Sequence, residues 1–447
     1  MRYIPHTEAD VAAMLSAIGL RSLDELIDHV PAELRRGATL DIADGLGEAD
    51  VAARLTALAA RNRVAPDLLC FAGAGAYPHF VPSVVDAVIQ RSEFATAYTP
   101  YQPEVSQGTL QATFEFQTLV AALFGLDVAN ASLYDGSTAT AEAVLMAKRL
   151  APKAGRVLLA ASLPPQYRQV VSTYLEGVAG LECVEVPFGA DGRIDAGALE
   201  RSLSPAPAGV VVGHPNFFGV IEDLGAIADA VHGADSLLVT VTAEAMSLGL
   251  LRAPGALGAD IAVGEGQSFG IPLSYGGPYL GLFATRERYV RSMPGRLVGE
   301  TVDEQGRRGY VLTLATREQH IRRERATSNI CTNQGLCALA ATVFLALAGR
   351  RGLREIADRN ARKARHALGR LRDRVGAELA FTAPFFNEFV VRLPDARRRH
   401  QRALERGVLA GVPLGQWYPQ LADALLMCAT EVHTADDVER LAEALSP

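Results

Sequence analysis

Short, almost wholly apolar runs separated by amphipathic stretches fill the middle of this chain. Six such runs occur, at Val157–Ala161, Cys183–Val186, Val210–Val212, Leu237–Val241, Ile261–Val263 and Leu280–Ala284. Helical patterns, such as those over 167–174 and 224–231, lie between the first four. Strands alternating with helices are typical of a parallel sheet, and strands without polar alternation are typical of a sheet covered on both faces. We therefore predict one large α/β domain over residues 65–315.

The residues before this domain have the pattern of short helices. Thr7 can cap a first helix, and Ser22 and Glu25 fit a capping box at the start of a second. A third helix is predicted over roughly 48–62. We assign residues 1–64 to an N-terminal helical segment.

After about residue 325 the pattern changes again. We expect, in order, helices over 334–349 and 353–374, a strand over 388–393, a helix over 395–405, a strand over 424–429 and a final helix capped by Thr434. This order predicts a small C-terminal α+β domain over residues 316–447.

The uncharged stretch of residues 326–349 raises the question of a membrane span. Its first ten residues are polar or small, and its continuous apolar part runs only from Leu336 to Gly349. That part is shorter than the ~20 residues needed to cross a bilayer. A buried helix is therefore the better interpretation.

Composition narrows the possible functions. The 447 residues carry 43 basic and 50 acidic side chains, a net charge of −7, so no general attraction to nucleic acid or anionic lipid is expected. The five cysteines form no C-x-x-C motif, and the histidines show no metal-ligand spacing, so neither a disulfide framework nor a metal site is expected. The first residues lack the apolar core of a signal peptide. We expect a soluble cytoplasmic protein.

Two glycine-containing segments are candidates for a ligand site. The triplet Gly-Ser-Thr at 136–138 opens a predicted helix, where free N–H groups suit a phosphate. Simple capping by Asp135 or Ser137 is the favoured interpretation of that segment. Residues 264–278 follow the predicted strand at 261–263 and so lie at the carboxyl end of the sheet, where ligands of such folds bind. This place at the carboxyl end of the sheet favours the interpretation that residues 264–278 are a functional loop, or one descended from a functional loop.

Two irregular polar segments are further candidates. Residues 94–108 combine two prolines with two tyrosines and several amides, so a regular element is excluded. A loop that contacts a ligand or partner and a rigid surface crossing are equally good interpretations of it. Residues 317–334 contain Arg322, Arg323 and Arg325, which can bind a carboxylate or phosphate, although a charge run is usually a solvated helix face.

Together these segments resemble the glycine dehydrogenase of the glycine cleavage system, also called P-protein. The resemblance rests on six blocks in one order: YTPYQPEVSQG at 98–108, NASLYDGSTA at 130–139, HPNFFGVIED at 214–223, GADIAVGEGQSFGIP at 258–272, YGGPY at 275–279 and REQHIRRERATSNICTN at 317–333. It covers essentially the whole chain. It is most specific for subunit 1, the N-terminal half in organisms that divide the enzyme between two chains.

The resemblance implies an aminotransferase-like (fold type I) architecture and pyridoxal phosphate chemistry. Such enzymes decarboxylate glycine, release CO2 and pass the aminomethyl group to the lipoyl group of H-protein. The implied partners are therefore glycine dehydrogenase subunit 2 and lipoyl H-protein, with glycine as substrate. In the subunit 2 half, the lysine that holds the cofactor follows the strand equivalent to 261–263. Here that position is Gln267, whose amide is not nucleophilic.

The sequence contains only three lysines, and none is placed to hold the cofactor. Lys148 and Lys153 flank a helix end, and Lys363 lies on the charged C-terminal helix. The strand at 237–241 also lacks the acid that such folds place against the pyridine nitrogen, and Glu244 comes slightly late. We infer that the partner subunit binds pyridoxal phosphate covalently and that this chain carries no catalytic residue. A stand-alone enzyme is disfavoured, and a regulatory or scaffolding pseudo-enzyme is the alternative.

The proline- and tyrosine-rich loop has the character of a segment that reaches a partner's cofactor site, as is common in fold type I dimers. Its prolines limit the entropy lost on ordering, and its tyrosines offer flat faces with a hydroxyl at the tip. Gln102 and Gln107 can donate to a carboxylate, and Glu104 is expected to face a basic group such as Arg322 or Arg323. We predict that the shared pocket or interface is lined by Tyr98, Tyr101, Gln102, Glu104 and, on the opposite wall, Asn329. The large domain is expected to present an apolar surface to subunit 2.

Overall fold

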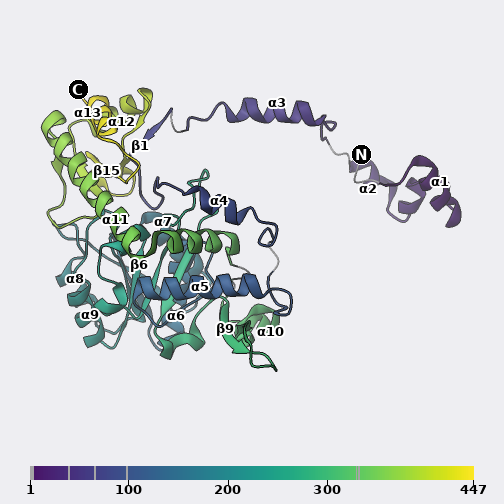
Figure 1. The fold of residues 1–447 in the computed structure, drawn as a ribbon, viewed down its shortest axis with the longest axis horizontal. Coiled ribbons are helices and arrows are strands. Elements are labelled where there is room, and N and C mark those ends of the chain that lie inside the picture. The colour runs from purple at the N-terminus through teal and green to yellow at the C-terminus, as the bar shows by residue number, and fades with distance from the viewer. Residues whose placement is uncertain (1–4, 39–40, 65–66, 97–98, 329, 331–332) are drawn as a thin grey trace. The chain divides into compact units, whose positions relative to one another are not determined.

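The computed structural model describes residues 5–38, 41–64, 67–96, 99–328, 330 and 333–447. The chain divides into two compact units, an N-terminal unit (Met1–Arg63) and a main unit (Val64–Pro447), whose elements are labelled in Figure 1. The described residues of the N-terminal unit form four short helices: α1 (Glu8–Ala17), η1 (Asp24–Ile27), α2 (Ala32–Gly37) and α3 (Glu48–Ala59).

The helices of the N-terminal unit begin close to where the sequence predicts. Thr7 accepts a hydrogen bond from the backbone of Asp10 at 3.2 Å, and the Asp10 carboxylate accepts the Thr7 N–H at 2.7 Å, so the cap of α1 is a complete capping box. The second box is only half formed. Ser22 accepts the Glu25 N–H at 3.4 Å, but the Glu25 carboxylate accepts the N–H of Arg21 instead. Helix α3 confirms the third prediction.

A seven-stranded sheet forms the centre of the main unit, with the order β2-β8-β7-β6-β5-β3-β4. Its strands are β2 (Val128–Ala129), β3 (Arg156–Ala160), β4 (Glu182–Val186), β5 (Gly209–Gly213), β6 (Leu237–Thr242), β7 (Ile261–Glu265) and β8 (Gly281–Thr285). The six predicted strands are confirmed. Strands β3 to β7 are parallel, whereas β8 runs antiparallel to β7. No helix lies between β7 and β8, and a parallel connection needs such a crossover, so the chain turns back instead.

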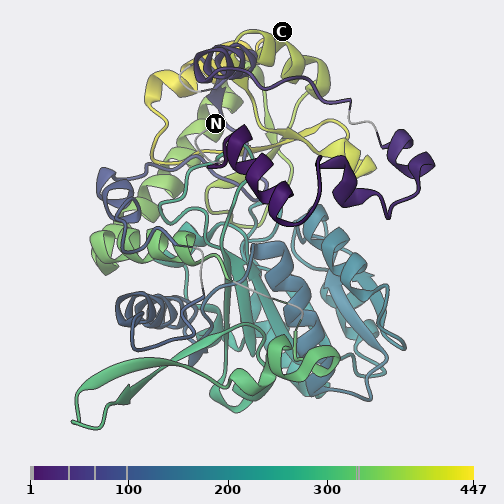
Figure 2. The same cartoon turned by 90° about the vertical axis from the view of Figure 1, so that its right-hand side faces the viewer.

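Apolar side chains of alternating strand positions point to the two faces of this sheet. Ile261 and Val263 belong to one buried cluster, whereas Ala262, between them, belongs to another. The helices that contribute to the first cluster are α6 (Gly136–Leu150), α7 (Pro165–Leu175), α8 (Ala196–Ser202) and α9 (Leu224–Gly233). Those that contribute to the second are α4 (Ser83–Ile89), α5 (Gln107–Phe124) and α11 (Gly335–Val375). The sheet is therefore covered on both faces over its central strands, as their apolar residues predict, whereas the edge strand β4 is mostly exposed. Figure 2 shows helices on both sides of the sheet.

The C-terminal part of the main unit carries a second, four-stranded antiparallel sheet with the order β11-β12-β15-β14. Its strands are β11 (Glu378–Leu379), β12 (Glu388–Arg392), β14 (Val412–Pro413) and β15 (Ala424–Cys428), and α12 (Ala396–Glu405) and α13 (Ala435–Ala444) accompany it. Thr434 caps α13 with a capping box, as predicted. Strand β1 (Leu69–Cys70) pairs with β13 (Val408–Leu409) in a separate ladder. The assignment of 65–315 and 316–447 to separate domains stays a prediction.

The remaining regular elements connect these layers. Strands β9 (Leu297–Val302) and β10 (Arg308–Thr313) form a hairpin. The short helices are η2 (Ala245–Gly249), η3 (Pro254–Leu257), η4 (Glu287–Ser292), η5 (Ala315–Arg317), α10 (Gln319–Arg322), η6 (Arg323–Arg325), η7 (Leu414–Gln416) and η8 (Pro419–Leu421).

Helix α11 unites the two helices predicted over 334–349 and 353–374. Its backbone is kinked at Gly349, where φ is 58° and ψ is −178°, a conformation that glycine adopts at little cost. By length and composition, α11 is the one helix in the described part of the chain that is able to cross a bilayer. Its apolar first half packs Phe344 and Leu345 into the core beside α5, as the core helix of a globular domain does. One face of this half is therefore buried, as predicted, whereas Leu336 and Leu347 on the remaining surface are exposed.

Candidate functional site

The position predicted for a cofactor lysine lies in the buried turn that follows β7. Gln267 is 1% exposed. Its Oε1 accepts the N–H of Tyr77 at 2.9 Å, and its Nε2 donates to the carbonyls of Tyr77 at 3.1 Å and Ile271 at 2.7 Å. The amide therefore holds the segment around Tyr77 against the end of the sheet, and no open space separates them.

The start of α6, where a phosphate is expected in a nucleotide- or cofactor-binding fold, is occupied by two carboxylates. Asp135 caps the helix by accepting the Thr138 N–H at 2.7 Å, which confirms the capping interpretation. Glu265, the last residue of β7, accepts the N–H of Gly136 at 2.9 Å. The other oxygen of Glu265 accepts the N–H groups of Gln267 and Leu280 at 3.0 and 2.8 Å. Burial raises the pKa of Glu265 to about 8.

Protein atoms also crowd this helix start. A Cβ at Gly136 would lie 2.4 Å from the Tyr167 hydroxyl oxygen and 3.1 Å from the backbone nitrogen of Glu265. Only glycine fits here for that reason. Two of the N–H groups at this helix start, those of Gly136 and Thr138, are already bonded to side chains of this chain, and such N–H groups are what attract anions to helix N-termini.

A buried cluster of charged side chains lies beside Gln267. The His79 side chain is 2% exposed, and it is placed between two carboxylates, with Nε2 3.1 Å from Glu244 and Nδ1 2.9 Å from Glu431. Burial alone would lower the pKa of His79, but the charges and hydrogen bonds of Glu244 and Glu431 outweigh it and raise that pKa to about 10. Glu244 also accepts hydrogen bonds from the Ser268 hydroxyl at 2.8 Å and the Met246 N–H at 2.9 Å. From the sequence, Glu244 was expected to come slightly too late in the chain to pair with a pyridine nitrogen. Its carboxylate does lie beside the turn after β7, but it is already bonded to His79, Ser268 and Met246.

The cluster continues into the C-terminal sheet through Glu388, the first residue of β12. The Tyr77 hydroxyl donates to Glu388 at 2.8 Å, and the Ala74 N–H donates to its other oxygen at 2.7 Å. Burial raises the pKa of Glu388 to about 8. The glycine-rich turn around Ala74 and Tyr77 is thus bonded both to the C-terminal sheet and, through Gln267, to the end of β7.

The lysine amines all lie elsewhere. Lys148 donates to the carbonyls of Pro152 and Ala154 at 2.9 and 2.7 Å, in the turn before β3 and thus at the opposite end of the sheet. Lys153 is exposed in the same turn. Lys363, on α11, donates to the carbonyls of Glu431 and His433.

Pyridoxal phosphate does not fit this arrangement. No amine is present where the fold would present one, and the helix start that would hold the phosphate is bonded to Glu265 and Asp135. A phosphate placed there would have to displace Glu265 from the Gly136 N–H and would lie against the capping carboxylate of Asp135. In the described residues, no group of three His, Cys, Asp or Glu side chains is arranged to hold a metal.

The two irregular polar segments of the sequence come together at a different place, around Arg296. The side chain of this residue is 8% exposed. Its guanidinium lies 3.3 Å from the Glu318 carboxylate and donates to the Tyr101 hydroxyl at 3.1 Å. Tyr101 also packs its ring edge-on against His320, with the centroids 5.5 Å apart. Arg296 therefore fixes Tyr101 of the first segment to Glu318 and His320 of the second.

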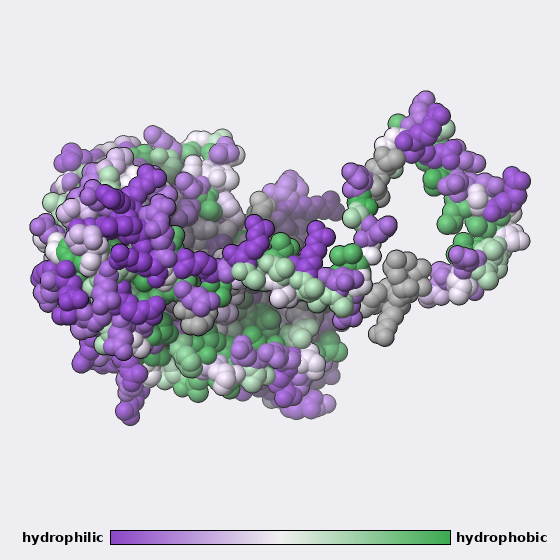
Figure 3. Space-filling model, turned by 90° about the horizontal axis from the view of Figure 1, so that it is seen from above, coloured by the Kyte–Doolittle hydropathy of each residue, from purple (hydrophilic) through white to green (hydrophobic). Residues whose placement is uncertain are grey.

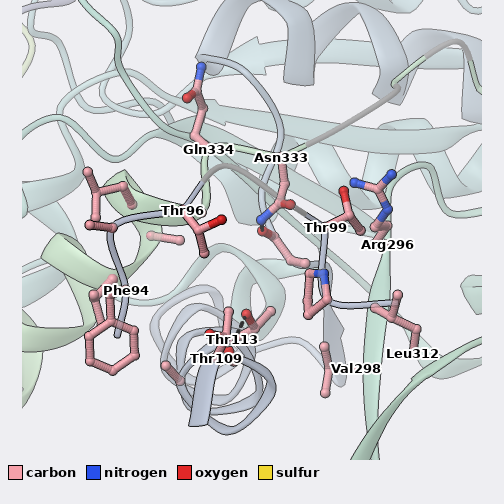
Figure 4. Close-up of a pocket in the computed structure, with 18 residues that line it drawn as sticks. Phe94, Thr96, Thr99, Thr109, Thr113, Arg296, Val298, Leu312, Asn333 and Gln334 are labelled. Carbon is pink, nitrogen blue, oxygen red and sulfur yellow. Dashed lines mark hydrogen bonds between the residues drawn. The ribbon is translucent and has the colours of Figure 1, made fainter. Parts of the chain in front are cut away.

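A pocket of about 560 Å³ lies next to Arg296. In Figure 4, Thr109 and Thr113 of α5 lie on one side of it and Asn333 on the other, with Phe94 and Arg296 at opposite ends. The walls are mostly apolar, and the segments that form them are the predicted loop, the hairpin β9–β10 and the start of α11.

The structure describes three of the five residues that we predicted to line the shared pocket, and all three are exposed. Tyr98 and Asn329 lie outside the described residues. Tyr101 is 46% exposed, and Gln102 and Glu104 are exposed as well. In the described residues no ion pair joins Glu104 to Arg322 or Arg323, and both arginines are exposed, as for a solvated charge run.

Gln107, predicted to be free to donate to a carboxylate, has a structural role instead. Its Nε2 donates to the carbonyls of Pro103 and Tyr310, both at 2.8 Å, and its Oε1 accepts the Tyr310 N–H at 2.9 Å. Both amide hydrogens are used, so the side chain fastens the end of the loop to β10.

The fold and the site together define the class of protein. A mostly parallel seven-stranded sheet with a smaller C-terminal sheet is the aminotransferase-like (fold type I) architecture of pyridoxal phosphate enzymes. A structure of sphingosine-1-phosphate lyase from Burkholderia pseudomallei shares this fold, with a TM-score of 0.66, 17% identity and 93% of each chain covered.

Within this class the chain belongs to the glycine cleavage system P-protein family, whose sequence model matches residues 1–445. It is similar to the "probable glycine dehydrogenase (decarboxylating) subunit 1" of Anaeromyxobacter dehalogenans, at 53% identity, and of Moorella thermoacetica, at 51%, with 99–100% of each chain covered. It is also similar to a crystal structure of glycine decarboxylase (P-protein) in inhibitor-bound form. That match has a TM-score of 0.90 and 45% identity, and it covers 100% of this chain and 99% of the other.

Proposed function

We propose that this chain is the half of a two-chain glycine dehydrogenase that does not hold the cofactor. Glycine dehydrogenase subunit 2 supplies pyridoxal phosphate and the lysine that binds it. The assembled enzyme decarboxylates glycine, releases CO2 and transfers the aminomethyl group to the lipoyl group of H-protein. The observation that carries the proposal is the filled cofactor position, where Gln267 replaces the amine and Glu265 takes the helix N–H group that a phosphate would need.

The contribution of this chain is to complete the partner's site. Tyr101 is held by Arg296 yet remains 46% exposed, so a face of its ring is available to a partner. We assign the lining of the shared site to Tyr101, Gln102 and Glu104 together with Tyr98 and Asn329. A hydroxyl held by a buried guanidinium is preorganised to orient a bound group, which is the usual source of large rate effects. Arg296 acts through Tyr101 and is therefore a positioning residue.

Co-expression with the cognate subunit 2 tests this proposal. The pair should catalyse exchange of the glycine carboxyl group with bicarbonate in the presence of lipoyl H-protein, and each chain alone should be inactive. Absorbance of bound pyridoxal phosphate should follow subunit 2 on separation of the chains. If this chain alone binds the cofactor and loses it to hydroxylamine, the stand-alone alternative is correct. If subunit 2 is equally active without this chain, the pseudo-enzyme alternative is correct.

A further inference from the structure

Arg317, at the end of η5, is a buried cation whose partners are backbone carbonyls. Hydrophilic residues cover much of the surface in view in Figure 3, where water solvates them, whereas Arg317 is 9% exposed. Its guanidinium donates to the carbonyls of Leu314 at 3.2 Å, Val290 at 3.3 Å, Gly295 at 3.1 Å and Met293. In the described part of the chain, no ion pair joins it to a carboxylate. Burial lowers the pKa of this guanidinium, because removing a charge from water is costly.

Arg317 holds part of a backbone segment, residues 292–296, in which every carbonyl is bonded from outside the segment. The donors are, in order, Arg149 to Ser292 at 3.0 Å, Arg317 to Met293, Asn130 to Pro294 at 3.0 Å, Arg317 to Gly295 at 3.1 Å and the Ala131 N–H to Arg296 at 2.9 Å. Gly295 has a φ of 76°, and a Cβ there would lie 2.7 Å from the side-chain nitrogen of Asn130. Segments that connect regular elements usually run over the surface, where water bonds their carbonyls. The backbone that leads into Arg296 is instead fixed by the protein.

Arg296, the last residue of this segment, is held by its side chain as well. Its guanidinium lies 3.3 Å from the carboxylate of Glu318, the residue that follows Arg317. It also donates to the Tyr101 hydroxyl at 3.1 Å and lies 5.5 Å from the centroid of the Tyr101 ring. Two successive residues, Arg317 and Glu318, thus fix the backbone and the side chain of the residue that holds Tyr101.

The segment around Tyr101 does little to orient this side chain by itself. Residues 101–105 form no helix or strand, and Tyr101, Gln102, Glu104 and Val105 are all exposed. Exposed loops are more mobile than the elements that they connect. The direction of the Tyr101 hydroxyl therefore depends on groups outside the segment, among which Arg296 donates the hydrogen bond.

We propose that Arg317 is a positioning residue for the shared site, because it fixes Arg296 and thereby the direction of the Tyr101 hydroxyl. This inference rests on the proposed function, in which Tyr101 lines the partner's site. Arginine suits the role because its planar guanidinium carries five N–H donors and can bond carbonyls that point in different directions. Without it the carbonyls of Met293 and Gly295 lose their donor, so the segment shifts. A displacement of about 1 Å can lower a rate on the order of 100-fold.

A double-mutant cycle in the reconstituted enzyme tests whether Arg317 acts through Tyr101. The variants are R317Q, Y101F and R317Q/Y101F, and kcat and KM for glycine are measured per assembled complex. We expect R317Q to lower kcat/KM by about 30-fold, and the double variant to be no more than about threefold below Y101F. A merely structural role would lower the unfolding temperature, and its effect on kcat/KM would multiply with that of Y101F, because the two losses would be independent.

R149Q is the matched control. Arg149 holds the same segment by one carbonyl, that of Ser292, four residues before Arg296. R149Q should therefore leave kcat/KM within about threefold of the wild type. Where R317Q does not fold, R317K replaces it. Its lysine keeps the charge but has a single nitrogen, so we expect a loss of about tenfold and the same lack of additivity with Y101F.

Millisecond hydrogen–deuterium exchange of this chain alone gives a second readout, which does not depend on subunit 2. The N–H groups of Tyr101 and Val105 donate to the carbonyls of Thr99 and Gln102 at 2.8 and 3.3 Å, so they report on the order of this loop. Both groups should exchange at least about fivefold faster in R317Q than in the wild type or in R149Q.

Three results overturn the inference. They are independent losses in the cycle, wild-type exchange of the loop in R317Q, and equal effects of R317Q and R149Q. If Y101F has wild-type kinetics in an assembled enzyme, the predicted lining fails, and faster exchange in R317Q then shows a structural contact only. If the wild-type chains do not form an active enzyme at all, the proposed function itself fails.

Discussion

Replacing Gln267 by alanine should destabilise the main unit strongly, even though no lysine chemistry is lost. The side chain makes three hydrogen bonds to backbone groups and is 1% exposed, so its removal leaves the Tyr77 N–H and two carbonyls without partners. Each buried polar group left unpaired costs about 1–3 kcal/mol. Allowing for partial relaxation, we expect the free energy of unfolding to fall by about 3–5 kcal/mol.

Urea unfolding of the isolated chain, followed by circular dichroism, measures this effect. A loss of this size corresponds to a midpoint shift on the order of 1 M urea. Gln102→Ala is the matched control, because Gln102 is exposed and the same atoms are removed. Its effect should stay within about 0.5 kcal/mol.

The same variant also separates folding from function. Where Q267A assembles with subunit 2 at low temperature, turnover per assembled complex should be close to that of the wild type, because the proposed function gives Gln267 no part in the chemistry. Equal midpoints for Q267A and wild type would refute the view that this residue fastens the turn around Tyr77. A large loss of turnover in an intact complex would instead show that the turn has a direct role in the reaction.

Three further predictions follow from the described contacts. Gln267→Lys should not make this chain bind pyridoxal phosphate, because Glu265 and Asp135 still occupy the helix start; a hydroxylamine-sensitive absorbance band in a titration with the cofactor would contradict this. Tyr101→Phe removes the hydroxyl that accepts a hydrogen bond from Arg296, and Tyr98→Phe removes the hydroxyl of the second tyrosine predicted to line the site. Each variant should lower kcat/KM for glycine by about 100-fold or more in the reconstituted enzyme. Wild-type kinetics with assembly intact would show that the loop has only a structural role. The pKa of His79 is raised to about 10, above that of a free histidine, so the stability it provides is complete below pH ~6.5 and is lost as the pH rises through 10. Urea midpoints of the wild type should fall over that range more steeply than those of His79→Gln, and parallel curves would count against the buried ion cluster.

The main sheet was predictable because its signal is local. Strands covered on both faces must be apolar at every position, and each such run in the sequence became a strand of the main sheet. Helix caps were predictable for the same reason, since Thr7 and Thr434 bond to residues three positions further on. No direction was predicted for β8, which depends on the connection from β7, and that connection lacks a crossover helix.

The buried cluster was not predictable, because its members are far apart in the sequence. His79, Glu244 and Glu431 come from three distant segments, and each alone has the appearance of an ordinary surface residue. Arg296 was missed for the same reason, since nothing near it in the sequence indicates that it joins two loops. Glu265 did carry a signal. An acidic residue at the end of an apolar strand, with no basic neighbour, must find backbone donors if it is buried, and here it accepts from three of them.

Under the proposed function, the way Glu265 is bonded makes a cofactor site in this chain hard to restore. A lysine gained at position 267 meets a closed turn, and removing Glu265 alone strands three buried N–H groups without an acceptor. Each single step towards a working site is therefore destabilising before it is useful. A working cofactor site would need several substitutions at once. Single substitutions that each destabilise the protein are removed by selection for stability. If the two chains divide the work as proposed, single substitutions are therefore not expected to return the cofactor to this chain.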